Sequence, residues 1–149
     1  MNKRTYTKDF KLYRAKKDGS GCAISFSFDP KNECVWLAGA KQAGDVFLWK
    51  NNIVMKLGLA DIGELISVLE RRKPFAGQEN SKYKSLFHQA DSHTSSLKFE
   101  SNSNMSISVQ MRVNKGEDNN IQHSLIMTQG ESSVLLVLLK DVISKIFDW

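Results

Sequence analysis

Alternation of apolar and polar residues dominates the first third of the chain. Residues 23–28 alternate up to the turn signal at residues 29–32 (Asp-Pro-Lys-Asn), and residues 34–38 form a second run. We expect a loop over residues 39–44, and the Asn-Asn pair at residues 51–52 predicts a tight hairpin between two further runs. Because strand side chains point alternately to the two faces of a sheet, this period predicts half-buried strands. The expected strands are residues 23–28, 34–38, 46–49 and 53–57.

The spacing of apolar residues then changes from every second residue to every third or fourth. This spacing is typical of an amphipathic helix, and Asp61 is a residue type that caps helix N-termini. Pro74 cannot continue a helix, and the basic residues just before it suit the negative end of a helix dipole. We therefore expect a helix from Asp61 to residue 73. Its apolar positions are Ile62, Leu65, Ile66 and Leu69.

The second half of the chain repeats this order of elements. Short strands are expected at residues 84–88 and 96–99, followed by the alternating run 105–113 and a strand at 124–127. A helix over residues 132–147 completes the half. Few residues are identical between the halves, so order and spacing carry the inference of a duplication.

The fold class that follows is α+β: a duplicated ββββα unit forming two packed antiparallel four-stranded sheets with two helices. We expect residues 1–149 to form a single domain, because a unit of about 70 residues alone would leave much surface uncovered. The repeat halves are placed at about residues 8–73 and 83–149, with a basic N-terminal arm at residues 1–8.

The last expected helix is apolar around most of its circumference. Residues 134–139 are all apolar, and further apolar residues follow up to Phe147. One side of the helix can pack on its own sheet, so the remainder predicts a second subunit. We expect a homo-oligomer through the helix from Val134 to Phe147; the alternative is a central core helix of a monomer.

Basic residues are concentrated near the N-terminus. The formal net charge is +5, with 14 Lys/Arg against 8 Asp/Glu in residues 1–75 and 7 against 8 in residues 76–149. A basic segment favours an anionic partner, most commonly nucleic acid; the alternative is a frayed, solvated terminus.

Cysteine usage and hydropathy indicate a soluble, intracellular protein. Cys22 and Cys34 match neither a disulfide framework nor a zinc spacing. The longest apolar run is too short to span a bilayer, and no secretory signal is recognised. The expected location is the cytoplasm or nucleoid, or an organelle if the chain is a processed eukaryotic form.

Residue patterns that carry catalysis are sparse. No Gly-rich phosphate loop occurs, and His88, His93 and His123 lack the spacing of a zinc-binding pair. A Ser/His/Asp or Cys/His site remains open as an alternative. The sequence favours a protein that is not an enzyme and holds no metal and no cofactor.

Lysine and arginine recur beside aromatic residues on several expected strands. Single-stranded nucleic acids are held by aromatic rings that stack on bases and by Lys/Arg along the backbone. Lys11 and Tyr13 would point to one face of a strand, as would Phe47 and Trp49. The alternative for each aromatic residue is a place in the core. The candidate nucleic-acid-binding residues are Lys11, Tyr13, Arg14, Lys16, Lys17, Trp36, Lys41, Trp49, Lys50, Lys98, Phe99 and Arg112.

Two segments of the chain carry an order of elements that is typical of a known family. In residues 49–69, Trp49 opens a hairpin strand that leads into an amphipathic helix starting Ile-Gly-Glu-Leu at residue 62. Residues 138–149 form an apolar helix that closes on Trp149. Both segments resemble the Whirly proteins, which bind single-stranded DNA. The resemblance extends over roughly residues 10–149 and consists of the shared order of turn, hairpin, helix and repeat.

The resemblance implies tetramers assembled through the helices. It also implies binding of single-stranded DNA along the sheet surfaces, with little sequence preference, in DNA maintenance or transcription. RNA binding, as by guide-RNA-binding relatives, and a non-catalytic scaffold are the alternatives. The K-G-K-A-A-L motif of plant members falls on residues 20–25 (Ser-Gly-Cys-Ala-Ile-Ser), which keep the glycine and the first alanine but neither lysine. The contacts and higher-order assembly attributed to that motif are therefore not carried over.

Overall fold

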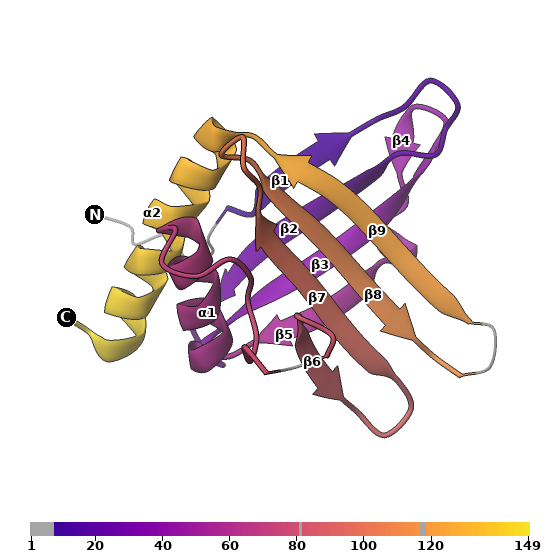
Figure 1. Cartoon of the computed structure of the whole chain (residues 1–149). Helices are drawn as coiled ribbons and strands as arrows, with labels where there is room; N and C mark the ends of the chain where they lie inside the picture. Colours follow the sequence, from indigo (N-terminus) through magenta and orange to yellow (C-terminus); the bar gives the residue numbers. More distant parts are fainter. Residues whose placement is uncertain (1–7, 81, 117–118) are drawn as a thin grey trace, which may run out of the picture.

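Two antiparallel β-sheets and two α-helices make up the computed structural model, which describes residues 8–80, 82–116 and 119–149. Residues 1–7 of the expected basic arm lie outside the described residues. The strands of the two sheets cross, and both helices pack together at one end of them (Figure 1).

The first sheet is built around its longest strand, β3. Strands β1, β2 and β3 pair in chain order, and β4 and β5 both pair with the far edge of β3. Helix α1 follows. The elements are β1 (Phe10–Arg14), β2 (Cys22–Asp29), β3 (Cys34–Ala43), β4 (Val46–Phe47), the 3-10 turn η1 (Trp49–Asn51), β5 (Ile53–Leu57) and α1 (Leu59–Leu69).

The second sheet has four strands, one fewer than the five of the first sheet, and a helix likewise follows its last strand. Its strands β6, β7, β8 and β9 are paired in sequence, and α2 follows. The α+β class and the duplicated order expected from the sequence are thus confirmed. The elements are β6 (Leu86–Gln89), β7 (Thr94–Ser101), β8 (Ile107–Asn114), β9 (Asn120–Met127) and α2 (Gln129–Phe147).

The loop expected over residues 39–44 is wrong, because β3 continues to Ala43. Gly39 faces the second sheet, and a Cβ atom there would lie 2.8 Å from Met111 Sδ and 2.9 Å from His123 Cδ2. A glycine inside a strand marks such a close approach as readily as a loop. Here the missing side chain lets the two sheets come together.

The hairpin expected at residues 51–52 is also wrong. Phe47 of β4 lies opposite Gln42, and Ile53 of β5 lies opposite Gly39, so both segments pair with β3 rather than with each other. The turn η1 carries the chain from one to the other. Strand β3 is long enough to satisfy the backbone groups of both segments, which removes the need for a hairpin.

Both helices begin earlier than expected, and in each a carboxylate of the first turn accepts a hydrogen bond from the N-cap amide. Helix α1 starts at Leu59, and Asp61 Oδ2 accepts a hydrogen bond from the Gly58 amide at 3.1 Å. Thr128 caps α2: its Oγ1 accepts from the Glu131 amide at 3.2 Å, and the Glu131 carboxylate accepts from the Thr128 amide at 2.9 Å. Reciprocal bonds of this kind satisfy amides that a helix start leaves unpaired.

Residues from both halves form one hydrophobic core between the sheets and beneath the helices. Phe99 and Met111 of the second sheet pack in this core with Leu37 of the first. Lys140 of α2 pairs with Glu70 at the end of α1 at 2.8 Å. None of the helices in the described ranges is long and apolar enough to cross a membrane.

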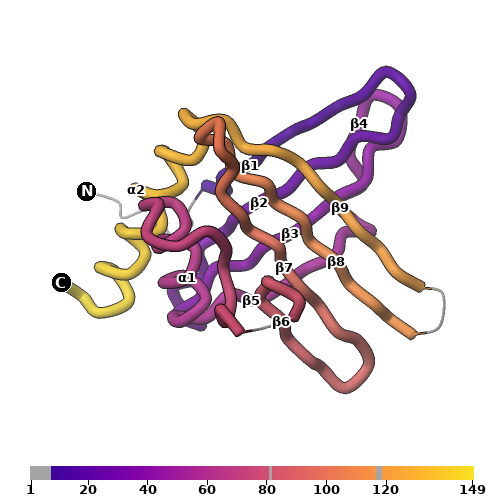
Figure 2. Tube along the Cα trace, viewed as in Figure 1, coloured from indigo at the N-terminus to yellow at the C-terminus, as the bar shows by residue number. Residues whose placement is uncertain are grey.

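The first and last strands meet at one edge of the two sheets, as the chain trace shows (Figure 2). Arg14 of β1 donates a hydrogen bond to the Ile126 carbonyl of β9 at 2.9 Å and pairs with Glu131 in the first turn of α2. Burial raises the pKa of Glu131, but hydrogen bonds from the Thr128 amide and from Arg14 outweigh it and hold the pKa below its ordinary value. This edge therefore joins the two halves through a charged, hydrogen-bonded contact.

Candidate nucleic-acid interface

A groove with a cavity volume of about 510 Å³ lies on the outer face of the second sheet. We call it the second-sheet groove. Its basic and aromatic residues are Lys82, Tyr83, Phe87, Lys98 and Arg112. The polar residues that line it include Thr94, Ser96, Gln110, Asn114, Asn120 and Gln122.

Strand pairing aligns these side chains in rows across the sheet. One row runs Phe87, Ser96, Arg112, Gln122 from β6 to β9, and the next places Lys98 opposite Gln110. Directly opposite residues on neighbouring strands point to the same face. The short side chain of Ser96 leaves room between the larger Phe87 and Arg112, which accounts for the hollow.

The charged residues that line the groove in the described part of the chain are all positive. Lys82, Lys98 and Arg112 line it, and no aspartate or glutamate does so within the part of the chain that the structure describes. Lys98 and Arg112 have exposed side chains. A concave surface lined by one sign of charge concentrates ligands of the opposite sign. The groove is therefore suited to an anion.

Two aromatic residues of the groove are open to solvent. Phe87 is 58% exposed and Tyr83 is 68% exposed. Large apolar side chains are usually buried in a folded protein. A phenylalanine that is exposed in a concave site lined by cationic residues therefore indicates a binding surface. Its ring offers a face on which a planar ligand group can stack.

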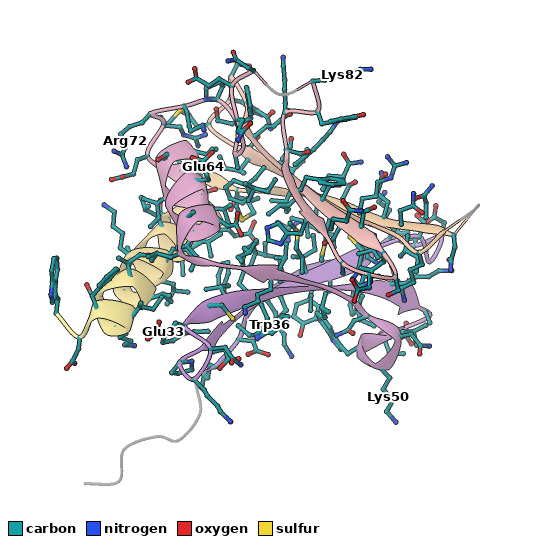
Figure 3. The ribbon with its side chains drawn as sticks, turned by 90° about the horizontal axis from the view of Figure 1, so that it is seen from below. Glu33, Trp36, Lys50, Glu64, Arg72 and Lys82 are labelled. Atoms are coloured by element: carbon teal, nitrogen blue, oxygen red, sulfur yellow. The ribbon has the colours of Figure 1, made fainter. Side chains whose placement is uncertain are left out.

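A second group of aromatic residues lies on the outer face of the first sheet. We call Lys11, Tyr13, Phe47 and Trp49 the aromatic cluster. The ring centroids of Tyr13 and Phe47 are 5.2 Å apart, those of Tyr13 and Trp49 are 6.4 Å apart, and Lys11 Nζ lies 5.1 Å from the Trp49 centroid. Figure 3 shows Lys50 of η1 and Lys82 on opposite sides of the molecule.

The aromatic cluster exists because small residues lie beneath it. In the strand register, Tyr13 is opposite Ala23, and Ala23 is opposite Ala40. Both alanines are fully buried although they share the outward face with Tyr13. The segment that carries Phe47 and Trp49 covers them, so this part of the first sheet is already packed.

No protein-family model matches the chain, and no curated protein sequence is significantly similar to it. Two solved structures share its architecture. MRP1/MRP2 from Trypanosoma brucei is 15% identical, with a TM-score of 0.67 over 94% of each chain. The plant transcriptional regulator PBF-2 is 18% identical, with a TM-score of 0.66 over 99% of this chain and 86% of the other. The chain has a Whirly-type fold.

Within this Whirly-type fold, the predicted contact residues fall into separate places. Lys98 and Arg112 line the second-sheet groove. Lys11, Tyr13 and Trp49 come together in the aromatic cluster, and Lys50 follows Trp49 in η1.

The remaining lysines and Trp36 lie outside both surfaces. Trp36 is half-buried on β3, and its Nε1 donates to Asp29 Oδ2 at 3.0 Å. Lys16 and Lys17 are exposed in the turn after β1, and Lys41 is exposed near the end of β3. Burial, and then the charge of Lys41, lower the pKa of His123.

The prediction that Phe99 contacts nucleic acid is wrong. Its side chain is 0% exposed and lies in the core between the sheets, where no base can reach it. Arg14 is half-buried, and its guanidinium already bonds Glu131 and the Ile126 carbonyl. It holds β1 to the start of α2 and is not part of either surface.

Sequence reasoning missed most of the groove. Lys82, Tyr83, Phe87, Gln110 and Gln122 were not among the predicted contact residues, although all five line it. Phe87 did give a signal, because it lies between buried Leu86 and half-buried His88 in a short strand. Gln110 and Gln122 gave no such signal, since polar residues are common on the solvent side of a strand.

The two cysteine thiols are buried rather than poised for chemistry. Burial raises the pKa of the Cys22 thiol, and burial together with Asp29 raises that of Cys34, so both thiols stay protonated at neutral pH. Across the described ranges, no group of three or more His, Cys, Asp or Glu residues is placed to hold a metal ion.

Proposed function

We propose that this protein binds single-stranded nucleic acid, preferring DNA, in DNA maintenance or transcription. The observation that carries the proposal is the second-sheet groove, whose described lining combines Lys82, Lys98 and Arg112 with exposed Phe87 and Tyr83 and contains no acidic residue. The likeness in fold to a plant transcriptional regulator agrees with this choice.

The groove chemistry favours unpaired strands over a duplex. Phosphates carry the negative charge that the basic residues would neutralise, and the aromatic rings would stack on bases. In a duplex the base faces are stacked on one another and out of reach. Stacking on Phe87 or Tyr83 would contribute about 1–3 kcal/mol per base, whatever the base.

We propose the aromatic cluster with Lys50 as a second contact surface. Its Tyr13 ring is half-exposed, and Lys11 and Lys50 add positive charge beside it. Because the two surfaces lie on opposite sides of the molecule, a strand that engages both has to pass around an edge or between subunits (Figure 3).

We also propose that the protein is a homo-oligomer, a tetramer, assembled through α2. Leu135, Leu139 and Val142 of α2 are buried against its own core. Several large apolar side chains of the C-terminal segment remain exposed: Val134, Val137, Leu138, Phe147 and Trp149. Exposed apolar patches of this kind mark interaction surfaces.

Fluorescence anisotropy with a labelled single-stranded DNA oligonucleotide tests the binding proposal. We expect Lys98→Ala to weaken binding and to reduce the slope of log affinity against log salt by about 0.7, the value for one lost phosphate contact to a single strand. Lys31→Ala is the matched control, because it removes the same charge from the exposed turn between β2 and β3.

Equal effects of Lys98→Ala and Lys31→Ala would show a general charge effect and reject the groove as the binding site. Failure of the wild-type protein to bind any single strand at low salt would reject the function. Competition between DNA and RNA oligonucleotides of the same sequence decides between the two nucleic acids.

A further inference from the structure

Arg112 occupies the middle of the second-sheet groove. The strand register places it between Ser96 of β7 and Gln122 of β9, and Phe87 is the next residue along the same row. Gln110 precedes it by two residues on β8 and therefore shares its face. Arg112 thus shares the groove with one aromatic ring, one short hydroxyl side chain and two amides.

Within the described part of the chain, the guanidinium of Arg112 has no hydrogen-bond acceptor. Among the arginines in the described ranges, Arg14, Arg71 and Arg72 each donate hydrogen bonds to protein acceptors. Arg112 has no such acceptor among the described residues, and its side chain is exposed. Five donors in a planar fork are therefore available to a ligand in a site that already attracts anions.

The planar guanidinium of arginine can distinguish between ligands that the ammonium group of lysine binds equally. Lysine supplies charge to any phosphate, whereas the arginine fork bonds best to two acceptors that lie side by side. Guanine presents such a pair at O6 and N7, while adenine places a donor beside N7. Guanine is also a two-ring base, which gives it a larger face than a pyrimidine for stacking on Phe87.

The side-chain amides of Gln110 and Gln122 suit a second edge of guanine. Guanine has N–H donors on the edge away from N7, and the side-chain oxygens of Gln110 and Gln122 can accept from them. In an unpaired strand this edge is open, whereas in a duplex it is occupied by cytosine. The residues of the groove thus offer partners for both kinds of polar group on one base.

We propose that the second-sheet groove selects guanine at one position of an otherwise sequence-tolerant single strand, with Arg112 bonding O6 and N7 and Phe87 stacking on the ring. The inference rests on the proposed function, since it needs a bound strand. It adds a specificity-determining residue to a surface whose other basic groups bind phosphate irrespective of sequence.

The test uses thymidine oligonucleotides of about ten nucleotides, a length within the range that single-strand binding domains cover. Each carries thymine, guanine, adenine or cytosine as the base at one central deoxynucleotide, and affinities are measured by anisotropy on the protein of residues 1–149. We expect the guanosine oligonucleotide to bind about 10-fold more tightly than the others, as a good bidentate contact allows.

Arg112→Lys is the decisive variant, because it keeps the charge and removes the fork. We expect it to weaken binding of the oligonucleotide with guanine more than binding of the plain thymidine oligonucleotide, so that the guanine preference disappears. Arg72→Lys is the control: Arg72 is exposed, pairs with Glu70 and lies outside the groove, so the preference should persist. Circular dichroism checks that both variants are folded.

Several results would overturn the inference while leaving the proposed function intact. These are equal affinity for all four oligonucleotides, a preference for adenosine or deoxycytidine, and a guanine preference that survives Arg112→Lys. Absence of binding to every oligonucleotide would instead reject the proposed function, and this inference with it.

Discussion

Gly39 and Gly63 illustrate how one residue type serves opposite purposes in this chain. Gly39 faces the second sheet where Met111 and His123 leave no room for a side chain. Gly63 lies inside α1, and a Cβ atom there would meet nothing within 4 Å. The first glycine is required by packing, whereas the second only adds flexibility to the unfolded chain.

Alanine substitutions at these two glycines should change the free energy of unfolding in opposite directions. We expect Gly39→Ala to lower it by about 1–3 kcal/mol, because the new methyl group overpacks the space between the sheets. Gly63→Ala should raise it by about 1 kcal/mol, the difference in helix propensity. Urea denaturation followed by circular dichroism measures both. A stabilising Gly39→Ala would contradict the close approach of the sheets.

At the scale of elements, strands and helices could be predicted wherever one face is buried. The alternation at residues 107–113 follows directly from packing on the core, and so does the helical spacing of Ile62 and Leu65. Predictions from local sequence patterns were wrong where residues distant in the chain determine the structure. Gly39 suggested a loop because its neighbours across the core, Met111 and His123, are 72 and 84 positions away in the chain.

The groove could not be predicted for the same reason. Phe87, Ser96, Arg112 and Gln122 become neighbours only through the register of four strands. Arg112 and Lys98 were both predicted as contact residues, Lys98 because of the aromatic residue beside it. That neighbour, Phe99, points the opposite way into the core, because adjacent residues on a strand face opposite sides.

The start of α2 offers a test at this scale. Thr128→Ala removes the side-chain oxygen that accepts from the Glu131 amide, and we expect the free energy of unfolding to fall by about 1 kcal/mol. Ser133→Ala, one turn further into the same helix and exposed, serves as the control and should not destabilise the protein. Both are compared at one protein concentration. An unchanged value for Thr128→Ala would show that Glu131 and Arg14 alone fix the helix start.

For the molecule as a whole, the distribution of charge along the sequence did not predict the second-sheet groove. The basic excess lies in residues 1–75, whereas the second-sheet groove lies in the half with 7 basic and 8 acidic residues. Folding separates these charges: Glu131 pairs with Arg14, and Asp141 with Lys145, away from the groove. Ligand binding depends on the sign of the charge in the groove itself, and the net charge of half of the sequence does not show that sign.

The exposed face of α2 leads to a prediction about assembly. Val137→Glu places a charge in the middle of the apolar face, so we expect the oligomer to dissociate to smaller species. Ser133→Glu adds the same charge to an exposed polar position of the helix and should leave assembly unchanged. Light scattering over a range of protein concentrations measures the mass. A wild-type protein that is monomeric throughout would contradict assembly through α2.

The aromatic cluster makes the two copies of the repeat unequal. Phe47 and Trp49 cover Ala23 and Ala40 on the first sheet, while the matching face of the second sheet stays open as a groove. The two copies of the repeat can therefore have different roles. One copy contributes to the rigidity of the molecule, and the exposed residues of the other copy can change in sequence. Over evolutionary time, the two alanines would be retained as strictly as core residues. The side chains around Arg112 would instead change whenever the preferred ligand changes.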